Sequence, residues 1–419
     1  MTEQQTFVIV GGGLAGARAA EAIRAEGFTG RVVMVAAEDA FPYIRPPLSK
    51  EYLQGTADPG SVFVHPDDWY AQQNIEVRRG QEASALSPSR HELTLASGEV
   101  MTYDKLLLAT GATARHFGGA ETDLPGVFYL RTLADSSALR AALSPGDRRV
   151  LVVGSGWIGL EVAATARGYG NTVTVLGHEP VPLAAAVGER VGHVFAALHR
   201  EHGVDLRSST DVEAILGDAR GVTGVRTTSG EVVPADVVVL GIGVIPNTGL
   251  AEAAGLEVDN GIVTNASFQT TDADVYAVGD VASVFHPVLG QRIRIEHWAN
   301  AENAGAAAGR AMAGADESYD EIPYFYTDQF DLGMEYSGYG VLAKDAEVVF
   351  RGDVEGREFL AFWLADSRVV AGMNVNVWDV NETVQKLIRD RVRVDAARLQ
   401  DESMALDDLL SAVGADEGK

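Results

Sequence analysis

Short apolar runs, glycine-rich turns and alanine-rich stretches alternate in the first part of the chain. Residues 7–10 form an apolar run suited to a buried parallel strand, and the glycine-rich segment 11–16 follows at once. Residues 17–26 have helical composition, residues 31–36 predict a second strand, and Glu38 lies just beyond it. This order of strand, turn, helix, strand and acid is the one that a dinucleotide-binding fold requires.

The same pattern recurs in the middle of the chain. Residues 150–153 predict a strand, residues 154–159 repeat the glycine-rich turn, and residues 160–168 have helical character. Residues 172–176 predict the next strand. Two copies in the same order indicate an internal duplication of a nucleotide-binding fold.

Three further apolar runs complete these two copies. Residues 103–110 predict another strand of the first copy, and residues 237–245 predict its counterpart in the second. Residues 276–278 predict a strand that returns to the first copy, which is therefore discontinuous in sequence.

After about residue 321 the pattern changes to alternating and aromatic segments. Residues 347–350, 359–364 and 369–377 predict antiparallel strands. A helix is predicted near residues 382–389.

These elements predict an α/β protein with two doubly wound, Rossmann-like domains and a smaller α+β C-terminal domain. We expect an FAD-binding domain at residues 1–110 and 244–320, an NAD(P)H-binding domain at 111–243 and the C-terminal domain at 321–419.

Composition narrows the function classes. The chain has 59 acidic and 33 basic residues, a net charge of −26, which disfavours nucleic acids and anionic membranes as partners. It has no cysteine, which excludes thiolate metal sites, bound iron–sulfur clusters and electron transfer to a protein dithiol. Electrons from a bound flavin must therefore pass directly to an external acceptor. No apolar run is long enough to cross a bilayer and no basic region precedes the first strand, so we expect a cytoplasmic protein. We also expect no bound metal.

The glycine spacing explains how each turn would bind a pyrophosphate. The first glycine permits the tight turn, the second lets the backbone approach the phosphates, and the third allows the helix to pack closely. The pyrophosphate then lies at the positive end of the helix. We expect FAD at the first turn, bound by Gly11, Gly13, Leu14, Ala15 and Gly16, with Glu38 accepting hydrogen bonds from the ribose.

The second turn is the predicted nicotinamide coenzyme site. Its expected binding residues are Gly154, Gly156, Trp157, Ile158, Gly159, Gly177, His178 and Gly243. Gly177 stands where an acid would select NADH by bonding the ribose 2′-hydroxyl, so NADPH stays open as an alternative. No Arg or Lys lies between residues 173 and 189 to bind a 2′-phosphate, and His178 is the sole candidate there. NADH is therefore the favoured interpretation.

Several motifs carry a resemblance to a known family. They are the segment 41–50, which contains Arg45 and Lys50, then Ala109-Thr110-Gly111, Glu161 after the second turn, Val278-Gly279-Asp280, Glu296-His297-Trp298 and residues 325–329. Over nearly its whole length the chain resembles the FAD-dependent NAD(P)H:ferredoxin reductases of bacterial oxygenase and P450 systems, the putidaredoxin reductase and rhodocoxin reductase-like family. The resemblance implies a glutathione-reductase-like flavoprotein fold.

The resemblance also implies residue roles. Arg45 and Lys50 would lie along the flavin, and Asp280 would bond its ribityl–phosphate region. Trp298 would border the isoalloxazine, and Glu161 would lie near the nicotinamide. Lys50, Glu161 and Trp298 are the predicted catalytic residues, with Lys50 pairing Glu161 in the free enzyme. The remaining residues that the resemblance places at FAD are Ala109, Thr110, Gly111, Gly279, Glu296 and His297.

Simpler interpretations stay open for three of these residues. Trp298 could be an ordinary core residue, and Arg45 could merely fix a loop. Glu161 could be a first-turn acid favoured by the helix dipole.

The chain departs from the family pattern at Ile44, Tyr326 and Gly177, where the family often has an acid, a tryptophan and an acid. Residues 182–186 also lack a usual arginine. These departures put coenzyme preference in question and leave FAD binding unaffected.

The resemblance implies hydride transfer from NAD(P)H to FAD N5, followed by two single-electron transfers to a [2Fe–2S] ferredoxin that feeds a P450 or other oxygenase. Ferredoxins are usually acidic, so docking requires a local cationic patch, for which Arg292, Arg294 and Arg310 are candidates. The alternatives are an NADH oxidase or rubredoxin reductase, and a redox-sensing interaction protein similar to apoptosis-inducing factor. We expect a monomer or a weak homodimer.

Overall fold

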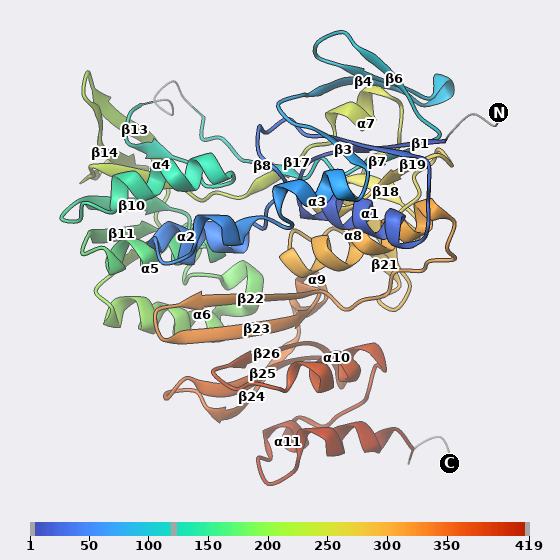
Figure 1. Cartoon of the computed structure of the whole chain (residues 1–419). Helices are drawn as coiled ribbons and strands as arrows, with labels where there is room; N and C mark the ends of the chain where they lie inside the picture. Colours follow the sequence, from blue (N-terminus) through green and yellow to red (C-terminus); the bar gives the residue numbers. More distant parts are fainter. Residues whose placement is uncertain (1–4, 119–123, 415–419) are drawn as a thin grey trace. The chain divides into compact units, whose positions relative to one another are not determined.

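The structure is a computed structural model that describes residues 5–118 and 124–414. The chain divides into two compact units (Figure 1). Unit 1 consists of Met1–Ile44, Pro59–Thr113 and Val244–Pro323, and unit 2 consists of Arg45–Asp58, Ala114–Gly243 and Tyr324–Lys419. Strands β8 (Ala112–Ala114) and β17 (Val244–Pro246) lie where the chain passes between the units.

Unit 1 is built on a five-stranded parallel sheet in the order β19-β7-β1-β2-β3. Its strands are β1 (Thr6–Val10), β2 (Arg31–Val35), β3 (Ile75–Arg78), β7 (Lys105–Leu108) and β19 (Val275–Ala277). The last residues of the four strands nearest the first turn are in register, because Val10 pairs with Val35 and Leu108, and Leu108 pairs with Ala277. The segments that follow these strands therefore emerge at one edge of the sheet.

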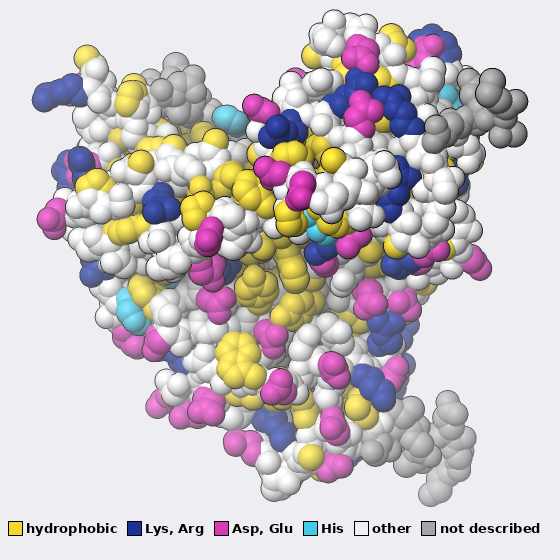
Figure 2. All heavy atoms as spheres, in the orientation of Figure 1, with side chains coloured by type: hydrophobic (Ala, Val, Ile, Leu, Met, Phe, Trp, Pro, Cys, Tyr) yellow, Lys and Arg dark blue, Asp and Glu magenta, His cyan; other side chains and the backbone are white. Residues whose placement is uncertain are grey.

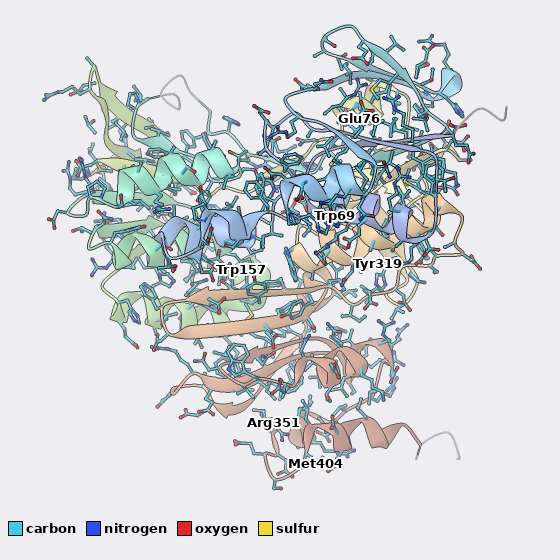
Figure 3. The ribbon with its side chains drawn as sticks, viewed as in Figure 1. Trp69, Glu76, Trp157, Tyr319, Arg351 and Met404 are labelled. Atoms are coloured by element: carbon cyan, nitrogen blue, oxygen red, sulfur yellow. The ribbon has the colours of Figure 1, made fainter. Side chains whose placement is uncertain are left out.

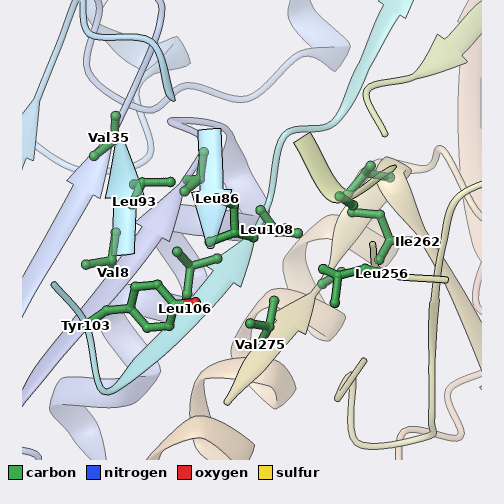
Figure 4. Close-up of a cluster of buried hydrophobic side chains, with 14 of the residues drawn as sticks. Val8, Val35, Leu86, Leu93, Tyr103, Leu106, Leu108, Leu256, Ile262 and Val275 are labelled. Atoms are coloured by element: carbon green, nitrogen blue, oxygen red, sulfur yellow. The ribbon is translucent and has the colours of Figure 1, made fainter. Parts of the chain in front are cut away.

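The two faces of this sheet are covered differently. One face packs against a small antiparallel sheet and forms the core shown in Figure 4, which includes Val8, Val35, Leu93 and Leu106. Helices α1 (Leu14–Ala25) and α8 (Trp298–Ala313) pack together at close range because small residues such as Ala15 and Gly305 face each other. The other elements of unit 1 are β4 (Ala83–Ser87), β5 (Glu92–Leu95), β6 (Val100–Thr102), β18 (Ile262–Thr264), β20 (Ala282–His286), β21 (Gln291–Ile293), α3 (Asp67–Gln72) and α7 (Gly249–Ala253).

Unit 2 repeats the architecture of unit 1. Its parallel sheet has the order β12-β11-β10-β16-β9, and again the strand ends are in register, with Val153 opposite Leu176 and Leu240. One face is covered by helices, and the other packs on the antiparallel sheet β13-β14-β15. The elements are β9 (Val127–Phe128), β10 (Arg149–Val153), β11 (Thr172–Leu176), β12 (Asp205–Arg207), β16 (Val237–Leu240), β13 (Val212–Asp218), β14 (Gly221–Thr227), β15 (Val232–Pro234), α2 (Glu51–Gln54), α4 (Leu133–Leu143), α5 (Trp157–Gly168) and α6 (Ala184–Glu201).

The C-terminal part of unit 2 is an antiparallel sheet in the order β22-β23-β26-β25-β24. Alternate residues of β26, such as Ala371 and Met373, share a core with the apolar side of α6. Gly372 lies on the opposite face, where Val384 of α10 approaches it closely. The elements are β22 (Tyr324–Gln329), β23 (Leu332–Gly338), β24 (Glu347–Asp353), β25 (Glu358–Ala365), β26 (Arg368–Val375), α9 (Gly340–Ala343), α10 (Asn381–Arg389) and α11 (Ala396–Gln400).

The last described residues are tied to this sheet by Arg351 of β24. Its guanidinium donates hydrogen bonds to the carbonyl oxygens of Asp401, at 2.9 Å, and Met404, at 2.5 Å (Figure 3). The C-terminal segment is therefore held by main-chain acceptors.

The predicted fold class is confirmed, and several element boundaries differ from the sequence-based expectation. The strand predicted at residues 237–245 ends at Leu240, because the Gly241-Ile242-Gly243 segment breaks it before β17. Both turn helices begin three residues earlier than predicted, directly after their N-cap glycines. No helix among the described residues has the length and apolarity needed to cross a bilayer.

Candidate functional site

The first glycine-rich turn has the geometry of a dinucleotide cradle. Gly11 has a φ of +129°, and a Cβ there would lie closer than 3.0 Å to the carbonyl oxygen of Ala109. A Cβ on Gly16 would similarly meet the carbonyl oxygen of Gly11. A Cβ on Gly13, in contrast, would have no described atom within 4 Å, and no side chain described there caps the helix that starts at Leu14. Open space therefore faces uncapped N–H groups, as binding of a pyrophosphate requires.

The acid predicted to bind a ribose follows β2 at the same edge of the sheet. The hydroxyl of Tyr43 donates a hydrogen bond to Glu38 Oε2 at 2.5 Å, and the main-chain N–H of Gly80 donates to the carbonyl oxygen of Glu38. Tyr43 is buried, so it fixes the direction of the carboxylate. Sequence reasoning did not assign Tyr43 a role.

Two further predicted segments reach this edge. Ala109, Thr110 and Gly111 follow β7, where Asn247 donates a side-chain hydrogen bond to the carbonyl oxygen of Thr110 at 2.8 Å. Gly279 and Asp280 follow β19, and a Cβ on Gly279 would lie 3.2 Å from the Cβ of Ala15. The structure thus brings together the four groups of residues that the sequence predicted separately. Asn247 was missed because no motif surrounds it.

Residues 296–298 precede and open helix α8 of the same unit. Trp298 exposes 36% of its surface, so the interpretation as an ordinary core residue is wrong. Burial lowers the pKa of His297 to about 4, although the charge of Asp280 opposes this shift, so the imidazole is neutral at neutral pH. Glu296 is paired with Arg294.

Arg45 and Lys50 belong to unit 2. The Arg45 guanidinium donates a hydrogen bond to the carbonyl oxygen of Arg131, ahead of α4, which agrees with the loop-fixing interpretation. Its position along the flavin stays a prediction.

The second turn repeats the geometry of the first. Gly154 has a φ of +107°, with the carbonyl oxygen of Gly241 closer than 3.0 Å to a Cβ position, and Gly159 is packed against Gly154 in the same way. A Cβ on Gly156 would have no described atom within 4 Å, and no described side chain caps α5. Both cradles therefore fit the groups assigned to them, FAD in unit 1 and a nicotinamide coenzyme in unit 2.

The residues beside Gly156 have different environments. Trp157, labelled in Figure 3, packs edge-on against Phe195 and Phe325, with ring centroids 5.5 and 5.1 Å apart. Ile158 is exposed. Gly243 ends the segment after β16, where its carbonyl oxygen accepts a hydrogen bond from the N–H of Arg115.

Gly177 and His178 occupy the strand end where the sequence predicts selection between coenzymes. The main-chain N–H of Thr210 donates to the carbonyl oxygen of Gly177, which places the 208–211 loop alongside. His178 Nδ1 lies 2.8 Å from Asp211 Oδ1, and this carboxylate raises the pKa of His178. Because His178 is paired with an acid, it offers a 2′-phosphate little net positive charge.

Ser155 occupies the space that a side chain at residue 177 would need. A Cβ on Gly177 would lie 2.9 Å from Ser155 Cβ and still closer to its Oγ. Gly177→Glu alone is therefore expected to leave coenzyme preference unchanged. Adding Ser155→Gly should let the new carboxylate bond a ribose hydroxyl and raise the NADH:NADPH ratio of kcat/KM about tenfold.

Steady-state kinetics with both coenzymes measures this ratio. Ser155→Gly alone is the control, and its ratio should equal that of the unchanged protein. If Gly177→Glu alone raised the NADH:NADPH ratio of kcat/KM equally, Ser155 would not be what blocks a side chain at residue 177.

Glu161 and Lys50 form a buried ion pair in unit 2. Lys50 Nζ lies 2.9 Å from Glu161 Oε1, so the pairing predicted from the resemblance is confirmed. Glu161 exposes 3% of its surface. It lies beyond the first turn of α5, which contains no acid, so the interpretation as a first-turn acid favoured by the helix dipole is wrong. Lys50 Nζ also lies 5.3 Å from the ring centroid of Tyr326, whose pKa burial raises to about 12. The ring therefore stays neutral beside the ammonium.

The three arginines proposed for partner docking are engaged within unit 1. Arg292 donates to the carbonyl oxygens of Thr264 and Ser283. Arg294 pairs with Glu296, and Arg310 pairs with Glu317. The charges of Arg294 and Arg310 are therefore balanced by acids, whereas the exposed Arg292 keeps its net positive charge. Docking at these arginines stays a prediction.

Two family models together match most of the chain. Residues 5–305 match the family model of pyridine nucleotide-disulphide oxidoreductases, and residues 324–410 match the reductase C-terminal domain. The ferredoxin–NAD(+) reductase component of the anthranilate 1,2-dioxygenase system of Burkholderia cepacia is 41% identical, covering 96% of this chain and 98% of that protein. Putidaredoxin reductase of Pseudomonas putida is 38% identical, covering 99% of each chain.

A solved structure is also similar to this chain. The crystal structure of the covalent putidaredoxin reductase–putidaredoxin complex contains a chain with a TM-score of 0.94 and 36% identity. The match covers 98% of this chain and 99% of that one.

Proposed function

The chain belongs to the pyridine nucleotide-disulphide oxidoreductase family and is an FAD-dependent oxidoreductase, and from this premise we propose that it is the ferredoxin reductase of an oxygenase system. In this role it takes electrons from NADH and delivers them singly to a [2Fe–2S] ferredoxin that serves a P450 or a dioxygenase. FAD, when bound, accepts a hydride from the reduced coenzyme and releases its two electrons one at a time.

The observation that carries this proposal is the pair of cradles in a chain without cysteine. Two glycine turns, each with open space before an uncapped helix, equip one chain for two dinucleotides. The family name refers to disulphide chemistry, yet the sequence contains no cysteine to form a disulphide. The electrons must therefore leave for an external acceptor, as in relatives that are named ferredoxin reductases.

The proposal assigns roles to the chain's own residues. We assign FAD to residues 1–110 and 244–320, with Glu38 as the ribose acceptor and Asp280 and Trp298 beside the cofactor. We assign the coenzyme to residues 111–243, with Glu161 near the nicotinamide. Lys50, from the Arg45–Asp58 segment of unit 2, is the ion-pair partner of Glu161. Residues 321–419 form the proposed C-terminal domain.

NADH is the proposed coenzyme. Glu179 and Asp211 place negative charge around Gly177, and the cationic form of His178 is offset by Asp211. This negative charge would repel a 2′-phosphate, and the residues described near β11 include no unpaired cationic side chain to bind it. The cytoplasm, where reduced coenzyme is generated, is the proposed location.

Rapid-mixing reduction of the bound flavin by NADH and by NADPH tests the first half of the proposal. Fast bleaching by NADH, followed by steady-state reduction of [2Fe–2S] ferredoxins from oxygenase systems, is the expected result. A flavin that neither coenzyme reduces would overturn it.

The same measurements separate the alternatives. Oxygen consumption at the full rate without a carrier would indicate an NADH oxidase, and rubredoxin preferred over every ferredoxin would indicate a rubredoxin reductase. Slow turnover with all carriers, together with coenzyme-dependent dimerisation, would indicate a redox-sensing protein.

A basic segment near the C-terminus is our revised candidate for the ferredoxin surface. Residues 386–398 carry five basic side chains against two acids, in a chain whose net charge is −26. Acidic side chains are spread over the face of the molecule shown in Figure 2. A local basic segment would therefore attract an acidic partner that the rest of the surface repels. Lys386, Arg391 and Arg393 are exposed.

Reversing these three charges to glutamate is expected to raise the KM for ferredoxin about tenfold at low salt, because steering and docking lose their attraction. The same reversal at Arg292, Arg294 and Arg310 is the comparison, and it should raise this KM less. Equal KM changes at low and high ionic strength would argue against an electrostatic surface at this segment.

A further inference from the structure

Buried polar side chains of unit 2 form one continuous line of hydrogen bonds that ends on the carboxylate of Glu161. Ser49 Oγ donates to Glu161 Oε2 at 2.5 Å, and Thr327 Oγ1 donates to Glu161 Oε1 at 2.5 Å. Lys50 Nζ shares the same Oε1 at 2.9 Å. The six members, each exposing no more than 6% of its surface, are Ser49, Lys50, Glu161, His199, Thr327 and Gln329.

The line continues past Thr327 into α6. Gln329 Nε2 donates to Thr327 Oγ1 at 3.2 Å, and His199 Nε2 lies 2.8 Å from Gln329 Oε1. The alternation of β22 makes this possible, because Thr327 and Gln329 lie on one buried face while Asp328 is exposed. Four separate segments of the chain therefore meet in one line: residues 49–50, α5, α6 and β22.

The direction of every proton in this line is determined by its members. The Thr327 hydroxyl has one hydrogen, which it donates to Glu161, so it must accept from the Gln329 amide. The Gln329 carbonyl is then the acceptor for His199, whose proton must be on Nε2. All the dipoles point toward the carboxylate, and each bond strengthens the next in a low dielectric.

His199 is restricted to the neutral, donating form. Its Nδ1 is buried and has no hydrogen-bond partner among the described residues, so a second proton there would be an unpaired buried donor. Desolvation lowers the pKa of His199 to about 4, although the hydrogen bond to Gln329 opposes this shift. His199 can therefore act only as a fixed donor at the far end of the line.

We propose that Thr327, Gln329 and His199 are positioning residues for Glu161, through which β22 and α6 set the orientation of the acid behind the coenzyme turn. This inference rests on the proposed function, because it takes Glu161 to be the acid near the nicotinamide. Glu161 lies two residues after Gly159, near the start of α5. Its carboxylate is held on both oxygens by groups outside that helix.

The proposal predicts what happens when the line is broken at either end. Thr327→Val removes the hydroxyl at nearly constant volume, and His199→Met removes the remote donor. With fewer donors the carboxylate holds its orientation less well, so NADH should bind less tightly and the KM for NADH in flavin reduction should rise more than kcat falls. Calorimetric titration of the holoenzyme with NAD⁺ should show about tenfold weaker binding for Thr327→Val. The loss should be smaller for His199→Met.

Conservative changes at the same two residues are the matched controls. Thr327→Ser retains the hydroxyl, and His199→Gln places an amide donor where Nε2 lies. Both should keep the KM for NADH and the NAD⁺ affinity of the unchanged protein. If one breaking variant fails to fold, the breaking variant at the other residue and its conservative control still provide the comparison.

Breaking and conservative variants that behave alike, or breaking variants with an unchanged KM for NADH and unchanged NAD⁺ affinity, would overturn the positioning role. Failure of the proposed function has a different signature. In that case the unchanged protein itself would show no flavin reduction by NADH or NADPH.

Discussion

Glu161→Ala is expected to lower the free energy of unfolding by about 3–5 kcal/mol, because it leaves the Lys50 ammonium buried without its carboxylate. The hydroxyls of Ser49 and Thr327 would lose their acceptor at the same time. The midpoint of urea unfolding, followed by tryptophan fluorescence, measures this loss. Flavin reduction by NADH should slow as well, because the acid assigned to the coenzyme site is gone.

The double variant Glu161→Leu with Lys50→Met is the control for this explanation. It removes both charges and fills the space with apolar atoms of similar volume, so it should recover much of the lost stability. If the double variant unfolds at the same urea concentration as Glu161→Ala, an uncompensated charge is not the cause.

Gly13→Val is expected to give a folded protein that has lost most of its FAD. Gly13 has an extended backbone that any residue adopts, and no described atom lies within 4 Å of a Cβ there. The new side chain would instead fill the space where a pyrophosphate approaches the helix, weakening FAD binding by at least about tenfold. Visible absorbance of the purified protein reports its flavin content.

Gly156→Val is the matched variant in the second cradle, where the surroundings are equally open. It should keep its FAD and show a KM for NADH raised by about tenfold. Equal flavin loss in both variants would contradict the assignment of one dinucleotide to each turn.

The chemistry of the two turns could be predicted because it depends on local spacing. Gly11, Gly13 and Gly16 must lie in that order for the strand, turn and helix to form, and the same holds for Gly154, Gly156 and Gly159. Glu38 could be found for the same reason, since it follows β2 at a predictable distance. The predicted boundaries of the helices and of β16 were less accurate. Each turn helix starts directly after its N-cap glycine, and the glycine-containing segment after Leu240 ends β16.

Other functional contacts depend on segments that no local pattern connects. Asn247 holds the turn after β7, and Ser155 fills the space opposite Gly177. The three arginines predicted for docking were chosen by charge and by position in the sequence, which do not reveal that their guanidinium groups bond neighbouring carbonyls and acids.

The sequence by itself determined a duplicated dinucleotide fold, its two ligand classes and the need for an external electron acceptor. These follow from short-range periodicity, glycine spacing and the absence of cysteine, all of which can be counted along the chain. Only the tertiary structure showed the hydroxyl donors that hold Glu161 beside Lys50. Its partners Ser49 and Thr327 are far apart in sequence, and burial in a low dielectric is what makes their hydrogen bonds strong and directional.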